Sequence, residues 1–504
     1  MFNRVWSAAL YGLEAPIITV EADYGGGDFG QIAIVGLPDA AVSEAKERVR
    51  SALRHCGLPF PQRKITVNLA PADLKKRGPA YDLPIAISIL ALKNKFSSAL
   101  STALITGEMS LSGEVRPITG ALSMALEAKA TGLNSIFLPT ANAAEAALVT
   151  DLKIFPVNHL FELTNHLLGK SLITVFSQTN QLEPPLINCE DLKNVHGQEK
   201  AKRALLIASA GGHNLLFCGP PGSGKTMLAK TMPGILPEPS LDEKMEITKI
   251  YSAAGELKIN SDLIHNRPFR APHHNASSVA LIGGGSRPKP GEISLAHRGV
   301  LFLDELPEFS RSTLESLRQP LEDGFINVSR AAGHLNFPAR FILLAAMNPC
   351  PCGYLGDPSN SCRCLPLQIT NYKRRLSGPI IDRLDLHVQV PRLNWDKLQV
   401  TTTSLDSSTA KGLVEFARTL QYKRFKKLNI HTNAEMSSSL TKDVCRLDNA
   451  GQKLLHQAQE SLKLSARAYF RLLKLTRTIA DLSGENQILN NHLAEALQYR
   501  IPLE

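Results

Sequence analysis

The sequence predicts an α/β protein whose central part is a parallel β-sheet built around a phosphate-binding loop. Two observations predict this class. An apolar run at residues 215–218 leads directly into GPPGSGKT at 219–226, and two further apolar runs, at 300–303 and 341–347, end in polar residues. Short apolar runs bounded by turn residues are typical of buried parallel strands. We therefore expect a parallel-sheet core that binds a phosphate-bearing ligand.

The overall composition describes a globular protein with two or three domains. The chain has 504 residues, of which 43% are hydrophobic and 20% charged, and its formal net charge is +10. This length exceeds one ordinary domain, and the positive charge permits a polyanionic partner without demanding one. No apolar run reaches membrane-spanning length, and the N-terminus lacks the pattern of a secretory signal. We expect a cytoplasmic protein that does not contact a membrane.

Residues 1–176 are predicted to form an α+β domain. Strand-like apolar runs at 17–22 and 65–69 alternate with a helical pattern at 40–56. No pair of side chains suited to acid–base chemistry stands out in this region. The polar, proline-containing residues 177–188 are expected to be a linker.

The loop at 219–226 has the spacing G-x-x-x-x-G-K-[ST] of a nucleotide-binding loop. Its glycines let backbone N–H groups surround a polyanion, and the helix that follows directs its positive end to phosphate. Lys225 is expected to reach the β- and γ-phosphates of ATP, and the Thr226 hydroxyl is expected to help hold Mg²⁺. The predicted nucleotide-binding residues are Gly219, Pro220, Pro221, Gly222, Ser223, Gly224, Lys225, Thr226 and Met227.

The other two apolar runs end in candidate catalytic residues. The second run is followed by Asp304 and Glu305. Asp304 is expected to bind Mg²⁺ through water, and Glu305 is expected to act as the general base on the attacking water. The third run ends at Asn348, which is expected to sense the γ-phosphate and to position the water. A turn before Pro349 is the other interpretation of this asparagine.

Four of the eight cysteines form two C-x-C pairs within residues 350–364. The residues between the pairs are rich in glycine, proline and asparagine, so the pairs are expected to face each other across a turn. Four thiolates suit tetrahedral Zn²⁺ and would fill all four positions, which makes the predicted site structural. Disulfides and an iron–sulfur cluster are the alternatives. The predicted zinc ligands are Cys350, Cys352, Cys362 and Cys364.

Two loops carry basic residues that are candidates for DNA binding. The loops at 270–291 and 328–334 contain Arg287, Lys289 and Arg330, which are candidate contacts to DNA phosphates. A solvated loop is an equally good interpretation for each of them.

Residues 396–504 are predicted to be helical because apolar residues recur at helical spacing. Arg467, near the start of one such helix, is a candidate second sensor of the γ-phosphate. Arg471 is its rival, because it lies four residues on and on the same face of the helix.

The motifs together resemble the ComM/YifB family of magnesium-chelatase-like ring ATPases. They are GPPGSGKT, GEISLAHRGVLFLDEL, AAMNPCPCGYLGD, SGPIIDRLD and LSARAYFRLLKLTRTIADL. The resemblance covers nearly the whole chain. It implies an AAA+ P-loop core at 189–395, a C-terminal helical lid at 396–504, and a homohexameric motor that promotes DNA branch migration during natural transformation. Single-stranded or branched DNA and a recombinase filament are the partners that it implies.

The resemblance also implies roles for individual residues. The segment GPIIDRLD is similar to the finger segment of magnesium-chelatase and MCM-type ATPases, which makes Arg383 the candidate arginine finger for a neighbouring subunit. Arg374 and Arg375 fit surface salt bridges better. A V-x-G-Q segment lies beside the adenine in many ring-forming ATPases, so Val195 and Gly197 are further nucleotide-site candidates. The two basic loops match the pore-directed insertions of that clade.

The N-terminal domain resembles the proteolytic domain of the Lon family. Gly78-Pro79 stands where the Lon pattern precedes its nucleophilic serine, but the next residue here is Ala80. The segment 121–124, Ala-Leu-Ser-Met, lacks the lysine that Lon has there. The resemblance therefore implies an inactive Lon-protease-like α+β domain, because a Ser–Lys dyad cannot form.

These observations leave two functions open. A DNA branch-migration motor agrees with the basic loops and the family resemblance. A magnesium-chelatase-like subunit that drives metal insertion or protein remodelling is the alternative, because it shares the same ATPase core. An ATP-dependent protease is disfavoured by the absent dyad.

Overall fold

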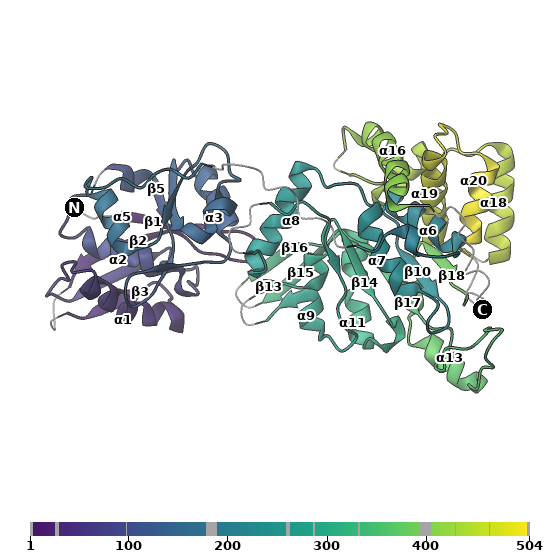
Figure 1. The fold of residues 1–504 in the computed structure, drawn as a ribbon, viewed down its shortest axis with the longest axis horizontal. Coiled ribbons are helices and arrows are strands. Elements are labelled where there is room, and N and C mark those ends of the chain that lie inside the picture. The colour runs from purple at the N-terminus through teal and green to yellow at the C-terminus, as the bar shows by residue number, and fades with distance from the viewer. Residues whose placement is uncertain are drawn as a thin grey trace. The chain divides into compact units, whose positions relative to one another are not determined.

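The computed structural model describes residues 4–25, 30–96, 98–177, 189–258, 263–285, 288–330, 333–392, 405–428, 430–462 and 464–500. Its contacts divide the chain into two units (Figure 1). The first unit comprises Met1–Pro184, Leu241–Ile264 and Arg287–Pro290, and the second comprises Pro185–Ser240, His265–Ser286 and Gly291–Glu504. Two segments from inside the predicted ATPase region therefore belong to the first unit.

The first unit is an α+β unit with one mixed sheet in the order β3-β4-β2-β1-β5-β8-β9. Strand β1 pairs antiparallel with β2, and parallel with β5 on its other side. Its elements are β1 (Arg4–Ala8), β2 (Ile17–Tyr24), β3 (Ile32–Val35), α1 (Ala40–His55), β4 (Ile65–Ala70), α2 (Asp82–Leu90), β5 (Ala103–Ile105), β6 (Glu108–Met109), β7 (Val115–Arg116), α3 (Ala121–Ala130), β8 (Ser135–Pro139), α4 (Ala143–Ala146), β9 (Lys153–Val157), α5 (Leu160–Leu167), α8 (Leu241–Ala254) and β13 (Lys289–Pro290).

Apolar residues on both faces of this sheet are buried. On β8, Phe137 packs into a cluster with α1, α2 and α5, whereas its neighbours Ile136 and Leu138 pack into a second cluster with α3 and α4. Alternate residues of a strand point to opposite faces, so helices cover both sides of the sheet here. The predicted helix at 40–56 is α1, whose first turn is capped by the Asp39 side chain.

The second unit contains a five-stranded parallel sheet in the order β11-β14-β17-β10-β18 (Figure 1). The predicted parallel-sheet core is therefore present. Its elements are α6 (Glu199–Gly211), β10 (Leu215–Cys218), α7 (Lys225–Ile235), β11 (Phe269–Arg270), α9 (Ser278–Ile282), β12 (Gly283–Gly284), α10 (Glu292–Leu295), β14 (Val300–Leu303), α11 (Arg311–Ser316), α12 (Arg318–Asp323), β15 (Phe325–Arg330), β16 (Gly333–Pro338), β17 (Ile342–Met347), α13 (Pro366–Arg374), α14 (Gly378–Ile381) and β18 (Leu386–Gln389).

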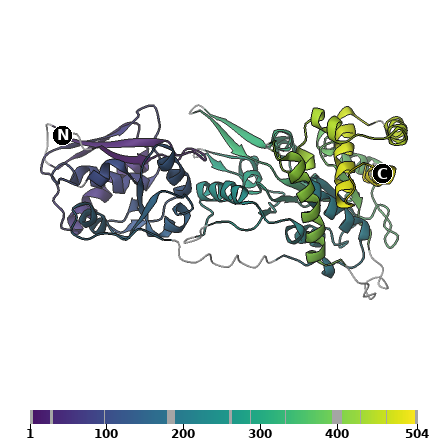
Figure 2. The same cartoon turned by 90° about the horizontal axis from the view of Figure 1, so that it is seen from above.

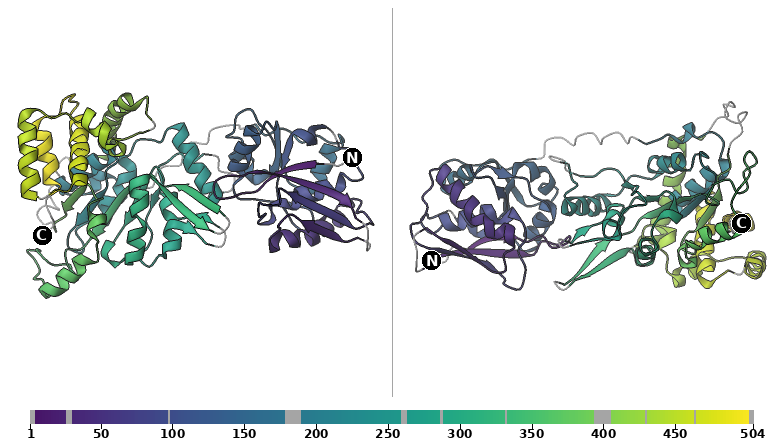
Figure 3. Two further views of the ribbon diagram at one scale, coloured as in Figure 1. Left: turned by 180° about the vertical axis from the view of Figure 1, so that it is seen from behind. Right: turned by 90° about the horizontal axis from the view of Figure 1, so that it is seen from below.

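Helices form the C-terminal part of the second unit. They are α16 (Ser407–Phe425), α17 (Ser438–Val444), α18 (Asn449–Leu462), α19 (Ala466–Leu482) and α20 (Asn490–Gln498), as predicted for a helical lid. Helix α16 packs on α6 and α7, and α19 packs on α6, so the lid shares one apolar core with the sheet. The antiparallel pair β15–β16 projects from the body of this unit (Figures 2 and 3). Among the described residues, no helix is long and apolar enough to cross a membrane.

Candidate nucleotide site and four-cysteine cluster

Three adjacent parallel strands bring the candidate nucleotide residues to one edge of the sheet. Cys218, the last residue of β10, pairs with Met347, the last residue of β17, and Leu303 at the end of β14 pairs with Ala345. The phosphate-binding loop, Asn348 and Asp304 follow these strand ends. Because the strands run parallel, all three groups lie at the carboxyl edge of the sheet.

The phosphate-binding loop has the backbone that its glycines permit. Gly222 and Gly224 have φ angles of 75° and 90°, in the left-handed region, and no heavy atom lies within 4 Å of where a Cβ would be. Gly219 has no such space, because a Cβ there would lie 2.1 Å from the carbonyl oxygen of Val390. Helix α7 begins at Lys225, so its positive end faces the loop.

Lys225 connects the loop to the neighbouring strand end. Its Nζ donates hydrogen bonds to the carbonyl oxygens of Gly219 at 2.7 Å and Pro220 at 2.9 Å, and to Oδ1 of Asn348 at 3.2 Å. Burial lowers the pKa of Lys225, because the protonated amine loses hydration. An anionic ligand would offset this desolvation, which fits a phosphate of ATP.

Ser223 supplies a second sign that the loop is built for a ligand. Its hydroxyl is buried and has no hydrogen-bond partner among the described residues. A buried hydroxyl without a partner is costly. Phosphate oxygens would satisfy it.

Thr226 and Asp304 lie together as a Mg²⁺ site requires. The Thr226 hydroxyl donates to Oδ2 of Asp304 at 2.7 Å. A hydroxyl and a carboxylate are hard oxygen ligands of the type that Mg²⁺ takes in nucleotide sites. These residues fit the ion that was expected here.

Glu305, the candidate base, is held by a residue that the sequence analysis placed in a basic loop. Glu305 has a φ of 52°, which is left-handed and uncommon outside glycine, and its Oε2 lies 3.3 Å from Nδ1 of His274. His274 follows strand β11, which pairs with β14, so the pair forms across two adjacent strand ends. The only local signal was the polar Pro-His-His sequence after the short strand.

The candidate arginine finger lies near the amino-terminal ends of the strands, opposite to the carboxyl ends that carry the phosphate-binding loop. Leu386 of β18 pairs with Leu215 at the start of β10, and Arg383 precedes Leu386. The Arg383 side chain is buried, with Nη2 at 2.6 Å from Glu322 and Nη1 donating to the carbonyl oxygen of Pro379. Its Nε has no partner among the described residues. Arg383 is therefore held away from the phosphate-binding loop of its own chain.

Both second-sensor candidates lie beside Arg383. Arg467 Nη1 is 2.9 Å from the same Oε1 of Glu322 that Arg383 contacts. Arg471 donates to the carbonyl oxygen of Arg383 and to Asp385. Arg467 is therefore paired with a carboxylate in this structure, and its expected swing onto a γ-phosphate stays a prediction. Glu322, which joins the two arginines, was not identified from the sequence, because its partners lie far away in the chain.

The remaining nucleotide candidates, Val195 and Gly197, precede α6. Val195 is buried in the main apolar core, and Gly197 has a left-handed φ of 55°. Next to them, Gln198 donates to the carbonyl oxygen of Pro391 at 2.6 Å. Their place beside an adenine stays a prediction.

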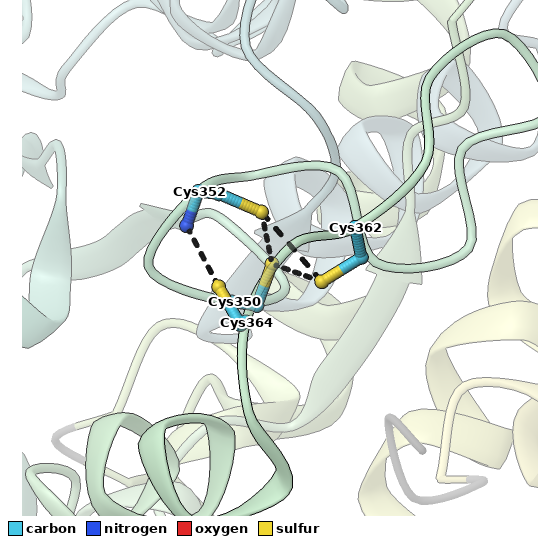
Figure 4. Close-up of side chains that lie close together, drawn as sticks. All are labelled: Cys350, Cys352, Cys362 and Cys364. Atoms are coloured by element: carbon cyan, nitrogen blue, oxygen red, sulfur yellow. Dashed lines mark hydrogen bonds between the residues drawn. The ribbon is translucent and has the colours of Figure 1, made fainter.

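The four cysteines of residues 350–364 converge (Figure 4). Their four Sγ atoms lie within 4.8 Å of one another, and the Cys350–Cys352, Cys350–Cys362 and Cys352–Cys362 pairs are 3.4, 3.6 and 3.6 Å apart. These separations are too long for disulfides. Four sulfurs at about 2.3 Å from a tetrahedral zinc ion would lie roughly 3.8 Å apart. The donor set therefore fits zinc.

Backbone groups also favour a thiolate in this cluster. Hydrogen bonds from the backbone of Tyr354 and of Arg363 lower the pKa of Cys352 to about 6. The thiolate is the form that binds metal.

The cysteine loop touches the phosphate-binding loop. A Cβ on Gly353 would lie 2.5 Å from Cδ of Pro221, and the φ of Gly353 is 85°. Cys350 also lies only two residues after Asn348, which contacts Lys225. The cluster is thus in position to fix the conformation of the nucleotide site. The contact between the two loops could not be predicted from the spacing of the cysteines.

The structure describes two of the three DNA candidates. Arg287 lies outside the described residues. Lys289, in β13 of the first unit, is exposed and donates to the carbonyl oxygen of Ala254 at 3.3 Å. Arg330 is the last residue of β15, at the turn of the projecting hairpin.

Comparisons with known proteins identify the family. The model of magnesium chelatase, subunit ChlI, matches residues 191–398, and the models of subunit ChlI of Mg-chelatase and of the ChlI C-terminal region match 20–142 and 404–500. Competence protein ComM of Haemophilus influenzae is 45% identical over 98% of this chain and 97% of its own length. The chain belongs to the ComM/YifB family of magnesium-chelatase-like proteins.

Other relatives agree with this assignment. The uncharacterized protein YifB of Escherichia coli is 44% identical over 98% of this chain and 96% of its own length. The chloroplastic magnesium-chelatase subunit ChlI of Chlamydomonas reinhardtii is 24% identical over 44% of this chain and 54% of its own length. Family membership makes the protein an AAA+ ATPase motor that uses ATP and Mg²⁺.

Proposed function

We propose that this protein is a ring-forming, ATP-driven DNA motor that promotes branch migration of recombination intermediates during natural transformation. The observation that carries the proposal is the similarity to a competence protein across the full length of both chains. In this proposal the protein acts as a homohexamer in the cytoplasm, on single-stranded or branched DNA that a recombinase filament has joined.

In the proposed mechanism one chain binds ATP through its phosphate-binding loop. Lys225 moves from Asn348 and the loop carbonyls onto the β- and γ-phosphates, and Ser223 gains a partner. Thr226 and Asp304 would hold Mg²⁺, which would supply positive charge beside the phosphates. Asn348 orients the attacking water, and Glu305 accepts its proton.

A neighbouring chain completes the site. Arg383 and Arg467 share the carboxylate of Glu322 at the sheet edge opposite the phosphate-binding loop. In this proposal they act on a nucleotide bound by another subunit, so that the hydrolysis sites of the ring lie between subunits. Hydrolysis then moves the basic loops that carry Arg287, Lys289 and Arg330 along the DNA backbone.

The cysteine cluster is proposed to hold structural zinc. Cys350, Cys352, Cys362 and Cys364 would fill its four positions, leaving none for a substrate. Elemental analysis should find about one zinc per chain. Cys352→Ser should lose it, and iron with acid-labile sulfide would contradict the proposal.

The test of the DNA function is the steady-state ATPase rate with and without single-stranded and forked DNA, at two salt concentrations. Salt-sensitive stimulation is expected, because contacts to phosphates release counterions. Lys225→Ala is the control and should show no turnover. A confirmed hexamer without any DNA stimulation would contradict the proposal and favour the alternative.

The alternative is a chelatase-like motor subunit that drives metal insertion or protein remodelling. The observation that favours it is the match of the chain to the ChlI models. ATP-dependent metallation of a porphyrin in the presence of partner chelatase subunits would support it.

A further inference from the structure

The first residues of helix α3 contact α8, which belongs to a segment from inside the predicted ATPase region. The N–H of Gly120, just before α3, donates to the carbonyl oxygen of Ser252 at 3.1 Å. The N–H of Leu122 donates to Oε1 of Glu145 at 2.8 Å. The first N–H groups of a helix have no partner inside the helix. Here a carbonyl of α8 and a buried carboxylate satisfy two of them.

Glu145 joins α8 to the rest of the first unit. Its side chain is 3% exposed, Oε2 accepts from Nδ2 of Asn142 at 3.1 Å, and Oε1 also accepts from the hydroxyl of Ser252. Burial raises the pKa of Glu145. A carboxylate buried at this cost requires its partners to stay in place, so the contact with α8 is specific. We call Gly120, Leu122, Asn142 and Glu145 the α8 socket.

The socket stands where the Lon resemblance places its missing lysine, just after Pro117-Ile118-Thr119-Gly120. A cavity of about 300 Å³ beside it is lined by Ala80 and Thr119, and by Ala253 and Lys289 from the two inserted segments. Met245 of α8 also packs against the apolar cluster of α3 and α4. The inserted segments therefore form part of the wall of the cavity at this place.

Only a short connection separates α8 from α7, the helix that follows the phosphate-binding loop. Helix α7 begins at Lys225 and ends at Ile235, and α8 begins six residues later at Leu241. Pro237 and Pro239 lie in this connection and restrict its backbone. A change in α7 on nucleotide binding would therefore reach α8 through a short, stiff connection.

We propose that the first unit responds to the nucleotide state of the ATPase core. In this proposal a movement of α7 on nucleotide binding is transmitted through α8 to the socket at the start of α3. This role goes beyond the DNA function and requires only nucleotide binding. It gives a use to a domain whose resemblance to Lon comes without the catalytic dyad.

Hydrogen exchange on the full-length protein tests this role. Exchange of the amides at the start of α3 is measured with and without adenylyl imidodiphosphate. In the unmodified protein, the nucleotide should change exchange there by about tenfold. Ser252→Asp, which places a second carboxylate beside Glu145, should abolish the change although nucleotide still binds.

Two controls and a milder variant keep the test decisive. Ser123→Ala removes a hydrogen bond of a buried α3 hydroxyl to Leu13, away from α8, and should keep the nucleotide effect. Lys225→Ala should show none. If Ser252→Asp fails to fold, Ser252→Ala, which removes only the hydroxyl, should weaken the effect at least threefold. An unchanged α3 in nucleotide-bound protein, or an effect that persists in the Ser252 variants, would overturn the proposal.

Discussion

The position of Arg383 predicts that two inactive variants restore activity when they assemble together. Leu215 pairs with Leu386 and Cys218 with Gln389, so the loop after Cys218 lies about three residue steps, roughly 10 Å, along the strands from the level of Leu386. Arg383 precedes Leu386 in the chain, and its side chain is bound by Glu322 and the carbonyl oxygen of Pro379. A finger that acts on a neighbour should be worth at least about 10³ in kcat, or about 4 kcal/mol.

The assay co-expresses Lys225→Ala and Arg383→Ala chains with different tags and isolates assemblies that carry both tags. Each variant alone should hydrolyse ATP at less than about one thousandth of the unmodified rate. In a random equal mixture, about one quarter of the interfaces join an intact phosphate-binding loop to an intact finger. The mixture should therefore recover up to about a quarter of the unmodified rate. A mixture as inactive as its components would refute the argument, and so would normal turnover by Arg383→Ala alone.

Three further predictions concern other contacts. Gly353→Ala should weaken nucleotide binding about tenfold, because the new Cβ would lie 2.5 Å from Pro221. The control Gly356→Ala, at a residue with a similar φ and open space around it, should leave binding unchanged. Equal nucleotide titration curves for the two variants would contradict this prediction. His274→Ala should lower kcat about tenfold without changing nucleotide affinity, because the candidate base loses its partner; an unchanged kcat would show that the pair does not matter. Burial lowers the pKa of His387 to about 4, so the unfolded chain binds a proton here at a higher pH than the folded chain does. The free energy of unfolding should therefore fall by up to about 3 kcal/mol as pH drops from 6.5 to 4. Chemical denaturation across this pH range should show that the free energy of unfolding of His387→Phe depends less steeply on pH.

The sequence was sufficient for the features that depend on local order. The loop at 219–226 and the apolar strands that precede the catalytic candidates are contiguous, so motif and periodicity predict them. The structure brings Lys225, Thr226, Asp304 and Asn348 together because their strands are parallel neighbours. It also brings the four cysteines together, as their spacing predicted.

The sequence was insufficient where contacts join distant segments. Nothing near Glu322 shows that it receives Arg383 and Arg467, and nothing near Ser252 shows that α8 packs on the N-terminal unit. The surroundings of Arg383 could not be predicted for the same reason. These contacts depend on tertiary packing, which periodicity does not encode.

Branch migration itself is the measurement that tests the central claim most directly. A labelled three-stranded joint molecule is incubated with the protein, ATP and Mg²⁺, and release of the displaced strand is followed over time. The account predicts ATP-dependent strand release by the unmodified protein. It predicts none by Glu305→Gln, which should bind nucleotide and DNA without turnover. Strand release by Glu305→Gln at the unmodified rate, or none by a protein that hydrolyses ATP on DNA, would contradict the account.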